Sequence, residues 1–98
     1  METEKLKEIE RRAVETYGPL NQKIKLFEEL SELQNAICKE RWGRDTVDHI
    51  AEEIADVLIL FDQMLIIYDI DPETVNDYFR SKLLRLEDRM DELQKGSD

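Results

Sequence analysis

Apolar residues recur every three or four positions along most of the chain, a spacing that predicts amphipathic α-helices. We expect four helices, over about 3–17, 20–41, 46–68 and 72–94, with 95–98 as a tail. Turn-forming residues separate them, at Gly18-Pro19, at Trp42 to Asp45 and at Asp71-Pro72. The pattern predicts an all-α, four-helix, bundle-like fold, with residues 1–98 as a single domain.

The predicted helix over 46–68 is apolar nearly all round. Ile54, Leu58 and Leu65 define one face, whereas Val57, Leu60 and Met64 fill a second, and Ile59 extends a third. A helix with this pattern is buried on almost every side, and three other helices of one chain hardly cover it. We therefore expect it at a subunit interface of an oligomer whose helices pack across subunits.

The composition narrows the classes of partner. A net charge of −10 over 98 residues disfavours nucleic acid, whose phosphates this chain would repel. The apolar run 54–70 contains Asp56, Asp62 and Asp69, so we expect no membrane span. A charged stretch follows Met1 where a signal peptide would be apolar, and the single cysteine fits a reducing compartment, so we expect a cytoplasmic protein.

Two acidic pairs carry the candidate chemistry. Glu29 and Glu32 are spaced i, i+3, as are Glu53 and Asp56, and each pair lies within an apolar helical segment. The residue numbers of Glu29 and Asp56 add to 85, as do those of Glu32 and Glu53. If the chain folds back near Trp42, the four carboxylates converge between two antiparallel helices.

Four converging carboxylates indicate a site for a hard cation. Buried carboxylates are strongly disfavoured unless they are paired or bind a metal, and all-oxygen ligation suits Mg²⁺ or Mn²⁺. The alternative is a set of ordinary ion pairs with Lys and Arg on a solvated face, because Asp and Glu make up about a quarter of the chain. The spacing alone leaves both interpretations open.

The same residues resemble a known family signature. Glu28-Glu29-Leu-Ser-Glu32-Leu, followed by Glu53-Ile-Ala-Asp56-Val, is similar to the motif of the MazG-like all-α nucleoside triphosphate pyrophosphohydrolases. The similarity spans roughly residues 14 to 93, and its flanking segments are Tyr17-Gly18-Pro19-Leu-Asn21-Gln22 and Lys82-Leu-Leu-Arg85-Leu-Glu-Asp-Arg89. The chain has one copy of the motif, as in the compact single-domain members.

The resemblance implies a Mg²⁺-dependent enzyme, with Mn²⁺ as a substitute, that converts a (d)NTP to the monophosphate and pyrophosphate. It also implies a homodimer or homotetramer. The implied metal ligands are Glu29, Glu32, Glu53 and Asp56, with Glu28 as an auxiliary acid. The implied substrate contacts are Lys82 and Arg85 for phosphates and Asn21 and Gln22 for the base. Base and sugar preference are not implied.

Two other hypotheses remain at this point. One is a non-catalytic, oligomeric helical protein with a regulatory or assembly role. The other, a di-iron carboxylate bundle, is disfavoured because it needs two Glu-x-x-His motifs and the chain has a single histidine. That residue, His49, lies one turn before Glu53, but we leave it outside the predicted site as an exposed residue. We also expect Lys25 to face solvent.

Overall fold

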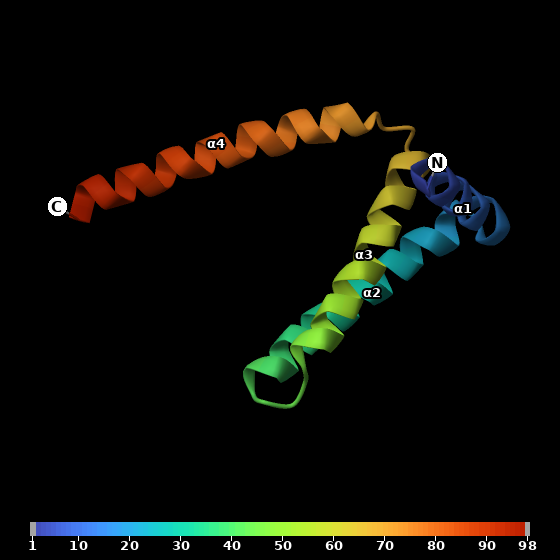
Figure 1. Cartoon of the computed structure of the whole chain (residues 1–98), viewed down its shortest axis with the longest axis horizontal. Helices are drawn as coiled ribbons and strands as arrows, with labels where there is room; N and C mark the ends of the chain where they lie inside the picture. The colour runs from blue at the N-terminus through green and yellow to red at the C-terminus, as the bar shows by residue number, and fades with distance from the viewer. Residues whose placement is uncertain (1, 98) are drawn as a thin grey trace.

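The computed structural model describes residues 2–97 and consists of four α-helices with no strand in that range (Figure 1). The helices are α1 Glu2–Tyr17, α2 Pro19–Arg41, α3 Val47–Ile67 and α4 Pro72–Ser97. The all-α prediction is confirmed. Each helix begins and ends close to the predicted residue, and the largest difference is the end of α4, which continues to Ser97 instead of 94.

Local sequence determines where α2 and α3 end. After α2, the N–H of Gly43 bonds to the Glu40 carbonyl and the N–H of Arg44 bonds to the Lys39 carbonyl, both at 2.8 Å. This pair of bonds closes a helix through a residue with positive φ, and Gly43 supplies it at +72°. Asp69 takes the same role after α3, at a φ of +52°. Both helices therefore stop sharply, which sets the directions of the next segments.

The core lies where α2 and α3 pack side by side as an antiparallel hairpin, with α1 across one end of it (Figure 1). Its buried apolar residues are small in number and size: Val14 of α1, Ala36 of α2, and Val57 and Leu60 of α3. Ala36 is 2% exposed, so even this small side chain is covered by its neighbours. This contact positions the acidic residues of α2 opposite those of α3.

Two successive hydrogen bonds from glutamine amides link the three packed helices. Gln22 Nε2 of α2 donates to Gln63 Oε1 of α3 at 2.6 Å, and Gln63 Nε2 donates to Glu10 Oε1 of α1 at 3.0 Å. Gln63 is only 2% exposed. Burial raises the pKa of Glu10, opposed by the Gln63 hydrogen bond. A buried amide that loses its hydrogen-bond partner destabilises the folded state, so these two hydrogen bonds fix how the helices align.

The outer faces of α3 remain uncovered within one chain. Leu58, Ile59 and Phe61 are about half exposed, although the sequence pattern predicts burial on nearly every side. No helix among residues 2–97 is long and apolar enough to cross a membrane. The outer faces of α3 are thus an apolar surface that neither α1 nor α2 covers.

α4 projects away from the other three helices and makes little contact with them (Figure 1). All its described side chains, from residue 72 to 96, are exposed. The radius of gyration is 17.5 Å, well above the value of about 13 Å for a compact chain of this length. One chain thus does not close into the expected four-helix bundle. The Asp71-Pro72 start of α4 directs it outward, where Asp71 Oδ1 accepts from the Glu73 N–H at 2.9 Å.

We expect Gln63→Leu to destabilise the protein by about 1–3 kcal/mol, because it leaves the buried Gln22 amide without its partner. The double variant Gln22→Leu/Gln63→Leu should cost less than the sum of the two single variants, since it removes both partners. Urea denaturation followed by circular dichroism measures both. The exposed Gln34→Leu variant is the control, and a Gln63→Leu cost no larger than the control's would contradict this role.

Candidate metal centre

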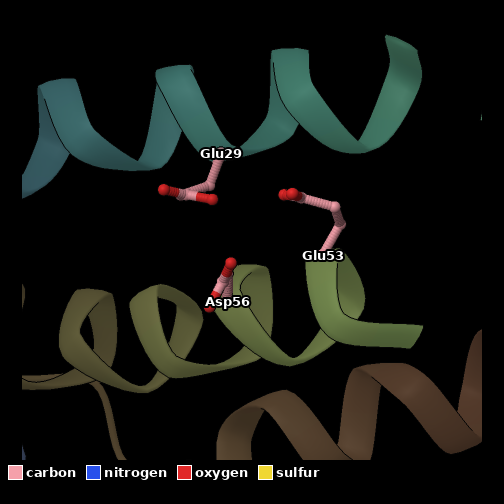
Figure 2. Close-up of side chains that lie close together, drawn as sticks. All are labelled: Glu29, Glu53 and Asp56. Carbon is pink, nitrogen blue, oxygen red and sulfur yellow. The ribbon is translucent and has the colours of Figure 1, made fainter. Parts of the chain in front are cut away.

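Three carboxylates face one another between α2 and α3 (Figure 2). Glu29 comes from the middle of α2, and Glu53 and Asp56 come from neighbouring turns of α3. One oxygen of each lies within 4.8 Å of the others. Figure 2 shows all three side chains pointing into the space between the helices. The hairpin thus brings together residues that are 24 to 27 positions apart in sequence.

Two of these carboxylates are deeply buried and incompletely satisfied. Glu29 is 6% exposed and Glu53 is 7% exposed, and Asp56 is half-buried. The Oε2 atoms of Glu29 and Glu53 have no hydrogen-bond partner among the described residues. Two unit charges about 5 Å apart repel by about 3 kcal/mol at an effective dielectric constant near 20. Three such pairs approach the whole stability of a small domain, about 5–15 kcal/mol.

The other oxygen of each buried glutamate has a cationic or donor partner on its own helix. Lys25 Nζ lies 3.2 Å from Glu29 Oε1, and His49 Nε2 lies 3.1 Å from Glu53 Oε1. Both partners precede the glutamate by one helical turn. The hydrogen bond and the charge of Glu29 raise the pKa of Lys25. The expectation that Lys25 only faces solvent is therefore incomplete, because its ammonium group pairs with a buried acid.

His49 is itself held from the other side. Its Nδ1 lies 2.8 Å and 2.9 Å from the two carboxylate oxygens of Asp45, in the loop before α3. The hydrogen bond to Asp45 raises the pKa of His49, and the charges of Asp45 and Glu53 act in the same direction. The same bond, together with the Thr46 N–H, lowers the pKa of Asp45.

The sequence prediction left His49 outside the site, and the structure places it against a site residue. The signal was present in the spacing, because Asp45, His49 and Glu53 follow at four-residue intervals, with Asp45 in the loop just before α3 and the other two on one face of α3. A lone histidine near a helix start is most often exposed, and the spacing alone does not distinguish that case from this one. The structure shows that both ring nitrogens are engaged.

Glu32 and Glu28 lie at the edge of the three-carboxylate group. Glu32 is exposed and does not belong to it, although the charge of Glu29 raises the pKa of Glu32. Glu32 lies one turn beyond Glu29 on α2, at the solvent-exposed edge of the hairpin. Glu28 is exposed and lies 3.8 Å from Lys25. The charge of Glu53 also raises the pKa of Glu32, but the Glu32 side chain is exposed, and Glu53 groups with Glu29 and Asp56 instead.

The predicted substrate contacts are not gathered around this group within one chain. Gln22 is buried and donates to Gln63, so its amide serves the packing of α2 on α3. Asn21 is exposed and donates to the Tyr17 carbonyl at 2.7 Å. Lys82 and Arg85 lie on α4, which projects away from the hairpin.

The donor set fits a hard divalent cation. All three groups are carboxylates from facing helices, and two of them, Glu29 and Glu53, each have a buried oxygen without a partner among the described residues. Mg²⁺ binds such oxygens at about 2.0–2.1 Å and keeps several waters of its own. Glu29, Glu53 and Asp56 would hold the ion, with the exposed Glu32 able to join from the rim.

Comparisons of the chain with protein-family models, with curated proteins and with solved structures return no match. The resemblance to the MazG-like signature therefore rests alone on the residues of the two acidic segments, 28–33 and 53–57, their flanking segments and their spacing. The geometry of the site supports a functional argument independently of that resemblance.

We expect Mg²⁺ or Mn²⁺ to raise the melting temperature, because a ligand that binds only the folded state stabilises that state. At a metal concentration of about 100 times the Kd, the gain in the free energy of unfolding is about 2.7 kcal/mol. The Glu53→Gln variant should lose this shift. Without metal it should melt no lower than the unmodified chain, since it buries one charge fewer. Thermal melts with metal or with EDTA measure both, with the exposed Glu52→Gln variant as control. An equal metal shift in Glu53→Gln would exclude this site.

Proposed function

We propose that the protein is a Mg²⁺-dependent pyrophosphohydrolase that converts a (d)NTP to the (d)NMP and pyrophosphate. The observation that carries the proposal is the pair of buried, unpartnered carboxylate oxygens, Glu29 Oε2 and Glu53 Oε2, beside Asp56. A folded protein keeps such a costly arrangement where a function compensates for it. The MazG-like signature in the same residues adds the substrate class.

Each residue of the site has a distinct task in this proposal. Glu29, Glu53 and Asp56 hold the cation, and the exposed Glu32 and Glu28 orient waters or the substrate at the open rim. A bound Mg²⁺ supplies charge neutralisation at phosphate oxygens and makes water more acidic. Water then adds across the anhydride bond between the α- and β-phosphates, which releases pyrophosphate. The strongly acidic chain needs this cation to accept an anionic substrate.

The assembly in this proposal is a homodimer or homotetramer in which α4 packs on another copy. One face of α4 is an apolar stripe that is exposed in the single chain, formed by Val75, Phe79, Leu83, Leu86, Met90 and Leu93. The outer faces of α3 are likewise uncovered. Association would bury both surfaces and form a bundle across subunits. It would also bring Lys82 and Arg85 of one copy towards the carboxylates of another.

Activity should depend on the buried acids. We expect Glu53→Gln and Asp56→Asn to reduce Mg²⁺-dependent pyrophosphate release by at least about 100-fold, the scale on which losing a charge-stabilising group acts. The exposed Glu52→Gln and Asp62→Asn variants are the matched controls. The assay uses a panel of standard and modified (d)NTPs. Full activity in Glu53→Gln would disprove the site, and no release from any substrate would favour the non-catalytic oligomeric role.

The shared site has its own test. We expect Glu53→Gln and the double variant Lys82→Ala/Arg85→Ala to be inactive alone, because each lacks one part of the site. After unfolding and refolding together as a mixture, about one quarter of the sites of a dimer should be complete, since random pairing reunites the two parts. Recovered pyrophosphate release measures this. A monomer by light scattering, or a mixture without activity, would contradict the shared assembly.

A further inference from the structure

The two buried glutamates of the metal centre are held in the same way. The Oε1 atom of each contacts a nitrogen of the side chain one turn earlier on its own helix. Lys25 Nζ lies 3.2 Å from Glu29 Oε1, and His49 Nε2 lies 3.1 Å from Glu53 Oε1. Each leaves its Oε2 buried and without a partner among the described residues. The same arrangement therefore occurs on both helices of the hairpin, once on α2 and once on α3.

We propose that Lys25 and His49 are positioning residues that fix the two glutamates so that each offers one inner oxygen to the cation. The inference rests on the proposed metal site and adds how its ligands are oriented. A glutamate side chain has three rotatable bonds, and fixing its outer oxygen restricts where the inner oxygen lies. Donors that orient a metal ligand from behind typically change metal affinity by 10–100-fold when they are removed.

The two partners differ in how firmly they are held. His49 is anchored by Asp45 through Nδ1 at 2.8 Å and 2.9 Å, so its ring is fixed between two carboxylates. Lys25 has a flexible stem, and its Nζ also lies 3.8 Å from Glu28. A side chain that is already immobilised loses less entropy in holding its neighbour. Removing His49 should therefore weaken metal binding more than removing Lys25.

If Lys25 and His49 acted only through their positive charge, removing them would change the metal affinity in the opposite direction. A positive group beside a cation site repels the incoming ion, so deleting it would tighten binding if charge alone mattered. A positioning role predicts weaker binding despite the lost repulsion. The direction of the change in affinity therefore separates the two roles.

The test is the affinity for Mn²⁺, read from the electron paramagnetic resonance signal of the free ion. We expect Lys25→Met and His49→Leu to bind Mn²⁺ about tenfold or more weakly. Lys25→Arg and His49→Gln keep a donor of similar reach and should stay within about threefold of the unmodified chain. Lys5→Met removes the same charge from α1, away from the centre, and should leave the affinity unchanged. Circular dichroism confirms that each variant keeps its helices.

The outcomes separate this inference from the proposed function. Unchanged or tighter Mn²⁺ binding in both Lys25→Met and His49→Leu overturns the positioning role and leaves the metal site standing. Weakened binding in these variants, with no pyrophosphate release from any (d)NTP by the unmodified protein, supports the positioning role and overturns the proposed function. An unmodified protein that binds no Mn²⁺ overturns both. If His49→Leu does not fold, His49→Asn, whose amide is too short to reach Glu53, replaces it with the same expectation.

Discussion

The register of α2 against α3 is the constraint on which the rest of this structure depends. The buried hydrogen bond from Gln22 to Gln63 fixes it at one level, and the buried Ala36, Val57 and Leu60 form the apolar part of the same contact. The residue numbers of Gln22 and Gln63 add to 85, as do those of Glu29 and Asp56. The amide bond and the acidic centre are therefore two levels of one antiparallel alignment, seven residues apart along each helix. A slip of one helical turn would separate the carboxylates.

That alignment buries mutually repelling carboxylates in a protein with a very small apolar core. Few apolar side chains are buried in the single chain, whereas two carboxylates and two amides are. The amides satisfy each other, but the glutamates keep one unpartnered oxygen each. Lys25 and His49 offset part of the repulsion among the three carboxylates, and few buried apolar side chains are present to balance the rest. A divalent cation between the helices, and a second copy on the uncovered faces of α3 and α4, are the two additions that would relieve it.

Periodicity predicted most of the fold because each helix has clear ends: Gly43 and Asp69 close α2 and α3, and Asp71-Pro72 begins α4. It did not predict that α4 stands apart, because an apolar stripe reads alike whether a helix of the same chain or of another copy covers it. The acid spacing located Glu29, Glu53 and Asp56. It did not show Glu32 turned outward or Gln22 used in packing, because these depend on how α2 and α3 face each other. His49 could have been found from its four-residue spacing to Asp45 and Glu53.

The central claim is that Glu29, Glu53 and Asp56 bind a divalent cation. Anomalous diffraction from crystals grown with Mn²⁺ tests it most directly, because it locates the ion without reference to any activity. We expect an anomalous peak between α2 and α3, about 2.0–2.3 Å from an oxygen of each of the three carboxylates. Ordered, well-resolved carboxylates with no anomalous peak between them, at millimolar Mn²⁺, would contradict it.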